Sequence, residues 1–260
     1  MPVRDPTSQS GSSDRNDPHV KRVRQLVRRL ASVPDPHILE CLAREMLSER
    51  PIELLAILLS TLGRLSREPE VRPIYMAVVR LCLSERDPPS EVREELYSVV
   101  AARGEGALVR FLLPVAPVKS MQQGSKAVDP VIEDMPLGMK KWKARLHDRN
   151  LFPRLAKDGD PNVIRILLDN PRVIEDDVLN WAARRPVHKE VLAIIARHPR
   201  WALRRKIQEA LARNPYTPVH IAASYLPVLP DQLLQLIRQD GSLHRLVKEA
   251  AGEILHLRTR

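Results

Sequence analysis

Lysines and arginines stand beside tryptophans at three places in the second half of the sequence. The nine candidate binding residues are Lys140, Lys141, Trp142, Arg184, Arg185, Arg200, Trp201, Arg204 and Arg205. Basic side chains attract phosphate without reading a base sequence, and a tryptophan ring can stack on a base or on a guanidinium group. If neighbouring helices bring the three clusters onto one surface, they form a basic, Trp-containing stripe.

The tryptophans also have a second interpretation, as core residues between helices. Trp181 and Trp201 would then be wedges between repeats, because a large ring more often fills space between helices than contacts a ligand. The arginines around them would then be solvated surface residues. We favour this interpretation for Trp181 and Trp201. The sequence leaves open whether Trp142, Trp181 and Trp201 lie in the core or in a groove.

The chain shows none of the common catalytic motifs. It contains no GxGxxG, GxxxxGK[ST], HExxH, GxSxG or CxxC sequence, and its two cysteines, Cys41 and Cys82, stand in separate apolar runs. The acidic run 175–177 precedes an apolar stretch, as carboxylates in the first turn of a helix do. The histidines that could meet on adjacent helices as metal ligands are His188, His198 and His220. We predict no enzymatic activity, no cofactor and no metal site.

The net charge of +10 lies entirely in the second half of the chain. Residues 1–135 contain 19 basic and 19 acidic side chains, whereas residues 136–260 contain 23 and 13. A basic half favours acidic or phosphate-bearing partners, although a solvated arginine-rich surface has the same composition. The chain begins without an apolar leader, and its apolar runs are too short to span a membrane, so we expect a cytoplasmic protein.

Short helices must position these residues. Aromatic residues make up only 3% of the chain and prolines number 23, a composition typical of many short helices with aliphatic cores. The polar segment 1–17 is expected to be disordered. Residues 115–136 mix proline, glycine, serine and lysine without periodicity, which predicts a linker. It separates a predicted helical bundle, residues 18–114, from a predicted helical-repeat domain, residues 137–260. The bundle helices after the first are expected near 36–48, 51–66, 70–84, 89–103 and 105–113.

Two Asn-Pro pairs mark equivalent places in the predicted repeat domain. Pro171 and Pro215 each follow an asparagine at the end of a short apolar run, 44 residues apart. Proline pushes the preceding residue out of the helical region, and asparagine can bond the backbone of its own turn. Each pair is therefore predicted to end a helix. Helices this short are stable only when stacked on their neighbours, as in a solenoid.

Two stretches of this domain resemble the leucine-rich repeat variant, a bacterial all-helical repeat. They are LAKDGDPNVIRILLDNPRVIEDDVLNWAA, from Leu155, and HPRWALRRKIQEALARNPYTPVHIAASYL, from His198. The resemblance covers about residues 150–240 and implies a right-handed superhelix of short paired helices, related to HEAT-type solenoids. The cysteine-rich iron–sulfur region of one member of that family has no counterpart here. The resemblance brings no activity with it.

The sequence as a whole predicts an all-α protein with an N-terminal bundle followed by an α-solenoid. The function we favour is that of a non-enzymatic scaffold or adaptor, which binds another protein, preferably an acidic segment, through its basic repeat surface. The alternative is sequence-independent binding of nucleic acid in a basic groove with exposed tryptophans. Such binding would weaken steeply with added salt.

Overall fold

A computed structural model of the chain describes residues 18–33, 36–48, 51–83, 89–120, 129–146 and 148–259. Throughout these residues the fold is all-α, as predicted, and contains no strand. The chain forms two compact units. Unit 1 contains the described residues up to Leu113 together with Leu226–Gln235 and the chain from Glu249 onward. Unit 2 contains Pro114–Tyr225 and Leu236–Lys248. The predicted disorder of residues 1–17 lies outside the described residues.

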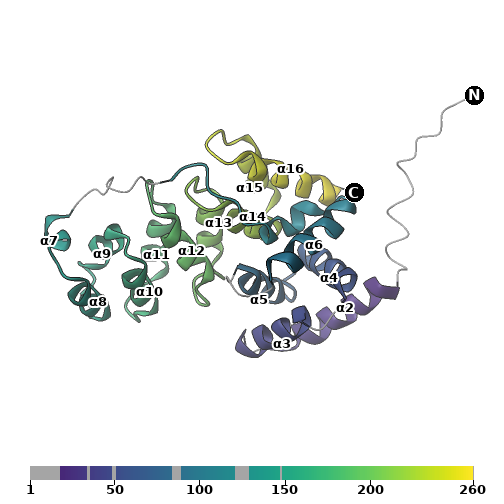
Figure 1. Ribbon diagram of the computed structural model, residues 1–260, viewed down its shortest axis with the longest axis horizontal. Coiled ribbons are helices and arrows are strands. Elements are labelled where there is room, and N and C mark those ends of the chain that lie inside the picture. The colour runs from purple at the N-terminus through teal and green to yellow at the C-terminus, as the bar shows by residue number, and fades with distance from the viewer. Residues whose placement is uncertain are drawn as a thin grey trace, which may run out of the picture. The chain divides into compact units, whose positions relative to one another are not determined.

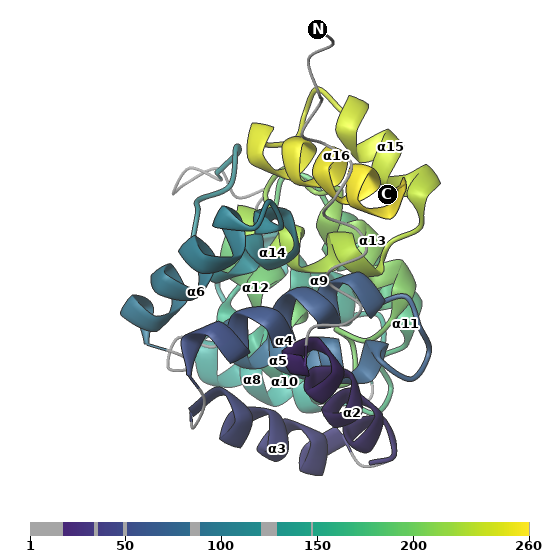
Figure 2. The same cartoon turned by 90° about the vertical axis from the view of Figure 1, so that its right-hand side faces the viewer.

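Unit 1 is built on long aliphatic helices. The helices are α2 (Pro18–Ala31), α3 (Pro36–Ser48), α4 (Ile52–Leu65), α5 (Arg72–Leu83) and α6 (Ser90–Ala102), followed by the 3-10 helix η1 (Gly106–Leu112). Helix α4 is nearly continuous in aliphatic residues and is buried from Leu55 to Gly63. It contacts α2, α5 and α6 (Figure 2). The core of this unit therefore surrounds α4, where apolar burial supplies most of the stabilisation.

The C-terminal segment, which the sequence assigns to the predicted repeat domain, belongs in part to unit 1. It comprises η2 (Leu226–Val228), α15 (Asp231–Gln239) and α16 (Arg245–Thr259), and the boundary between the units passes through α15 and α16. The Ser66 hydroxyl donates to the carbonyl of Pro227 at 2.7 Å. Asp231 accepts from Arg258 at 2.6 Å and from Arg67 at 3.1 Å. These polar contacts join chain segments that are far apart in the sequence, so local spacing did not reveal them.

Unit 2 consists of shorter helices that follow one another closely. They are α7 (Pro130–Glu133), α8 (Leu137–Arg145), α9 (Phe152–Asp158), α10 (Pro161–Asp169), α11 (Glu175–Ala183), α12 (Lys189–Arg197), α13 (Arg205–Ala212) and α14 (Val219–Tyr225). Helix α10 packs against α8 and α12, and α11 packs against α9 and α13 (Figure 1). The helices thus form two rows, in which every second helix belongs to the same row.

Proline and aspartate set where α10 begins. The Asp160 carboxylate accepts from the backbone N–H groups of Asn162, at 2.8 Å, and Val163, at 3.1 Å, which are two of the donors left free at a helix start. Pro161 follows at the first helical position, where its missing N–H costs nothing. Gly159 ends α9 with φ of 75°, a conformation that glycine adopts without strain. The turn between the two helices is therefore tight.

The two Asn-Pro pairs do more than end helices. The side-chain oxygens of Asn170 and Asn214 accept from the backbone two residues later, at 2.9 and 3.0 Å, as predicted. Their amide nitrogens reach the preceding helix of the same row. Asn170 donates to the carbonyls of Ala144 and Leu146, at 2.8 and 2.9 Å. Asn214 donates at the same two distances to carbonyls at the end of α11, those of Ala182 and Arg184.

Part of the predicted linker, residues 115–136, has regular structure. The backbone N–H of Val219 donates to the carbonyl of Val115 at 3.0 Å, and that of Lys119 donates to Pro215 at 3.2 Å. Near the end of this segment, α7 contacts α9, and Arg154 forms an ion pair with Asp129 at 2.6 Å. The start and the end of the segment are therefore both held by partners distant in sequence.

No helix within the described ranges is long and apolar enough to cross a membrane.

Candidate functional site

The nine candidate residues all lie in unit 2, but they occupy three separate places. Helices α11 and α13 lie side by side and run in the same direction. At their starts, Arg204 is 3.9 Å from Glu175, and at their ends Asn214 bonds the carbonyls that close α11. Arg184 and Arg185 follow the end of α11, whereas Arg204 and Arg205 begin α13. Nine residues of helix span about 13 Å, so these two pairs stand roughly one helix length apart.

Two of the three tryptophans are core residues. Trp201 is 1% exposed and Trp181 is 6% exposed. The Trp201 ring nitrogen donates to the carbonyl of Leu168 at 2.8 Å, which joins the turn after α12 to the end of α10. The Arg200 guanidinium lies 4.2 Å from the centre of the Trp201 ring. Neither buried ring can offer its face to a base. Trp142, in contrast, is 55% exposed.

The first cationic group stands at the start of α13. It consists of Arg200, Arg204, Arg205 and Lys206, all exposed, with the exposed Leu203 between them. Arg204 lies beside Glu175, whose neighbours Asp176 and Asp177 belong to the same first turn of α11. Arg205 and Lys206 have no hydrogen-bond or ion-pair partner within the part of the chain that the structure describes. This group is therefore free to bind carboxylates, next to an acidic turn of its own.

The second cationic group, at the end of α11, is more strongly engaged with the protein. Arg185 donates to the carbonyl of Arg213 at 2.5 Å. Burial lowers the pKa of Arg184. Asp240 supplies a negative charge nearby. Its hydrogen bond from the Ser242 hydroxyl, and in smaller part the charges of Arg185 and Arg213, hold its pKa below the usual value. Asp240 therefore partly balances the positive charge of this group.

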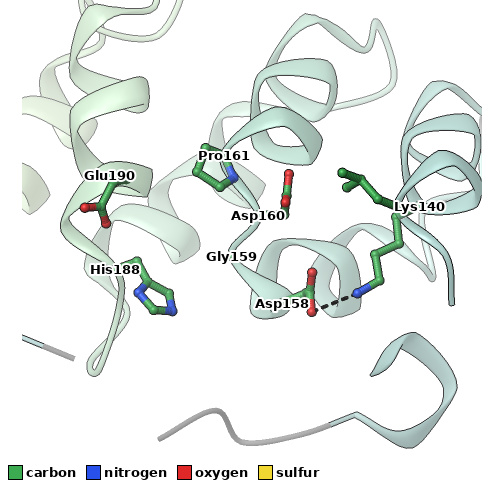
Figure 3. A pocket seen from close by; sticks show the side chains of 8 residues that line it. Lys140, Asp158, Gly159, Asp160, Pro161, His188 and Glu190 are labelled. Carbon is green, nitrogen blue, oxygen red and sulfur yellow. Dashed lines mark hydrogen bonds and ion pairs between the residues drawn. The ribbon is translucent and has the colours of Figure 1, made fainter. Parts of the chain in front are cut away.

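The third group lies on α8 beside a cavity of about 340 Å³. Figure 3 shows Lys140 reaching Asp158, with which it forms an ion pair at 3.1 Å. Both side chains are only 12% exposed, so the positive charge of Lys140 is paired with Asp158 within the protein. Lys141 is half-buried and Trp142 faces solvent. The cavity is lined by Leu137, Lys140, Asp158, Gly159, Asp160, Pro161, His188 and Glu190.

The polar side chains of this cavity serve structural roles. Asp158 holds Lys140, and Asp160 caps α10. The His188 ring packs so closely on Gly159 that a Cβ atom added there would lie 2.9 Å from the ring carbon Cδ2. Glu190, in the first turn of α12, is exposed. Two of the three carboxylates that line the cavity, those of Asp158 and Asp160, are therefore bound to other groups of the protein.

The histidines considered as metal ligands are not brought together. His188 precedes α12, and His198 follows its end, where its ring nitrogen lies 3.1 Å from a carboxylate oxygen of Asp169. The two are separated by the whole of α12. No group of three or more metal-ligating side chains occurs among the residues that the structure describes.

Helix α8 also has an apolar feature that its charged residues do not indicate. Met139 and Leu146, 49% and 36% exposed, stand on either side of Trp142 in the sequence. The signal was their spacing of three and four residues around Trp142, which places all three on one side of a helix.

The chain matches no protein-family model, no curated protein and no solved structure. Any functional conclusion therefore rests on the chemistry of these surfaces.

Proposed function

We propose that this protein is a non-enzymatic scaffold of stacked helices that binds an acidic segment of another protein through the basic surface of unit 2. The observation that carries the proposal is the cationic group at the start of α13. Its side chains are exposed, two of its charges have no described partner, and the neighbouring Trp201 ring is buried. Leu203, 38% exposed among these cations, suits an acidic segment that also carries apolar side chains.

The arrangement of α11 and α13 favours a protein partner over a nucleic acid. The acidic first turn of α11 (Glu175–Asp177) lies beside the basic start of α13. Because a nucleic-acid backbone carries a phosphate at every nucleotide, it would pass close to these carboxylates and be repelled. A protein segment can place acidic residues only opposite the cations. The burial of Trp181 and Trp201 also leaves no exposed tryptophan ring in the cationic group at the start of α13 on which a base could stack.

The solenoid assignment belongs to the same proposal. The two rows of short helices, and the repeated bond from an Asn-Pro asparagine to the preceding helix of its row, support a HEAT-like repeat. The resemblance to the leucine-rich repeat variant points the same way. In such a fold successive units present a continuous surface, a common basis for binding extended protein segments.

A direct competition between probes tests this function. A fluorescent peptide of alternating glutamate and leucine with serine spacers, and a single-stranded oligonucleotide of about 20 nucleotides, are titrated with the full chain, and anisotropy is measured. We expect the peptide to bind more tightly than the oligonucleotide. The double variant Arg205→Glu with Lys206→Glu should weaken peptide binding by about tenfold or more, since attraction becomes repulsion.

The matched control moves the same charge elsewhere. Arg28 and Arg29 are exposed on α2 in unit 1, and reversing both changes the net charge equally. We expect that control to bind the peptide within about twofold of the parent, because exposed charges outside the binding group are screened by salt. Tighter binding of the oligonucleotide, lost on reversal at Arg205 and Lys206, would instead establish the nucleic-acid function.

A further inference from the structure

The side of α8 that faces away from its neighbours is apolar. Met139 and Trp142 of α8, and Leu146 directly after its end, follow one another at intervals of three and four residues and are 49%, 55% and 36% exposed. On the opposite side of the helix, Ala144 is fully buried and Lys140 pairs with Asp158. We call Met139, Trp142 and Leu146 the outer face of α8. A contiguous exposed apolar patch on a protein surface can mark an interaction site.

The outer face lies at the end of a row of packed helices. Helix α10 packs against α8 from within the row, and Asn170 of α10 bonds the carbonyls at the end of α8. The opposite side of α8 is therefore where one more helix of the row would pack. The terminal helix of such a stack needs a polar outer surface to remain soluble alone. The terminal helix here presents a methionine, a tryptophan and a leucine instead.

The charges beside the outer face are basic. At 3.6 residues per turn, Lys143 and Arg145 fall on opposite sides of the stripe. No ion pair holds either side chain within the described residues, and Arg145 donates only to the carbonyl of Lys141 in its own helix, at 3.4 Å. A second copy of the chain related by a two-fold axis would bring like charges together, which disfavours self-association. An acidic partner would face both cations favourably.

We propose that the outer face of α8 binds an amphipathic helix of a partner protein whose apolar stripe is bordered by acidic residues. The bound helix takes the place of the next helix in the row. Its anchors enter between Met139, Trp142 and Leu146, and its carboxylates meet Lys143 and Arg145. Apolar anchors at intervals of three, four and seven residues are the usual basis of helix recognition. This inference rests on the proposed scaffold function and specifies a second contact of the same partner class.

Trp142 is a built-in reporter for the test, because the other two tryptophans are buried. The probe is a helical peptide about five turns long, with leucines on one side and glutamates beside them. A matched peptide carries lysine in place of each glutamate. We expect the glutamate peptide to shift the tryptophan emission to the blue and to protect it from acrylamide. It should bind about tenfold more tightly than the lysine peptide.

Two variants assign the binding to α8. Met139→Ser with Leu146→Ser keeps the fluorescent reporter and should weaken binding of the glutamate peptide at least tenfold. Lys143→Glu with Arg145→Glu should reverse the preference, so that the lysine peptide binds more tightly. The matched control is Leu236→Ser, which removes an apolar side chain that is 52% exposed on α15. We expect the control to leave peptide binding unchanged within about twofold.

The remaining outcomes overturn the proposal and separate it from the proposed function. A blue shift with vesicles of anionic lipid but not with the peptide would make the face a membrane contact. Protection of Trp142 on raising protein concentration alone would make it a self-association surface. If charge reversal at Arg205 and Lys206 weakens binding of the acidic peptide but the serine substitutions do not, the α8 site is wrong and the scaffold function stands. If neither acidic peptide binds, both are wrong.

Discussion

The two units hold their helices together in different ways. In unit 1 the helices from α2 to α6 have 12 to 14 residues, and α4 is buried along nine consecutive residues. In unit 2 the helices from α8 to α14 have 7 to 9 residues, and side chains bond the backbone of neighbouring helices at their ends. Such bonds come from Asn170, Asn214, Trp201 and Tyr225, the last donating from its hydroxyl to the carbonyl of Ala196 at 3.2 Å. Short helices leave a larger share of their carbonyls unpaired, so unit 2 depends more on such bonds.

The largest effect that separates the two modes is expected at Asn214. Asn214→Ala removes the bonds to the carbonyls of Ala182 and Arg184 and leaves backbone groups in a buried site without partners. We expect the free energy of unfolding to fall by about 2–4 kcal/mol. Urea denaturation followed by circular dichroism measures this change.

The control for Asn214 is Asn180→Ala on the exposed side of α11. This substitution removes the same amide without a buried partner, and a change within about 0.5 kcal/mol is expected. Equal destabilisation by the two substitutions would show that the amide bonds between neighbouring helices do not stabilise unit 2.

A smaller effect is expected in unit 1 as the pH falls. Burial raises the pKa of Asp231, but its bonds and charge interactions with Arg258 and Arg67 outweigh this and keep the pKa below its usual value. A carboxylate with a lowered pKa in the folded state contributes stability above its unfolded pKa, and loses it as the pH falls through the folded pKa.

We therefore expect Asp231→Asn to destabilise the protein near neutral pH and to differ less from the parent in acid. The effect should be about 0.5 kcal/mol, because the carboxylate is 48% exposed and is screened by solvent. Thermal unfolding of both proteins across the acidic range measures it. A difference that stays constant down to strongly acidic pH would contradict the role given to these ion pairs.

The two Asn-Pro pairs allowed the ends of α10 and α13 to be predicted from the sequence. Pro161 begins α10 and Asn170 follows its end, because the signals for starting and ending a helix are local. The interpretation favoured for Trp181 and Trp201, as core residues between helices, agrees with their burial. The helix expected near 51–66 corresponds to α4.

What the sequence did not reveal depends on contacts between distant segments. The second role of Asn214 requires α11 to lie beside α13, and no local pattern states which helices are neighbours. The expected single stripe was divided for the same reason, since Arg184 and Arg204 stand at opposite ends of parallel helices. Asp231 could not be assigned to unit 1 without its bonds to Arg67 and Arg258. The outer face of α8 is indicated by apolar spacing, whereas the predicted stripe was defined by charge and tryptophan content.

The exposure of Trp142 and the burial of the other two rings are central to the protein-binding account, and one measurement tests them directly. Acrylamide quenching of tryptophan emission is compared between the parent and Trp142→Phe. The account predicts that the substitution removes most of the emission that acrylamide can quench, leaving Trp181 and Trp201 protected. Emission that stays equally accessible after the substitution would place a second ring on the surface. It would then restore the stacking surface on which nucleic-acid binding depends.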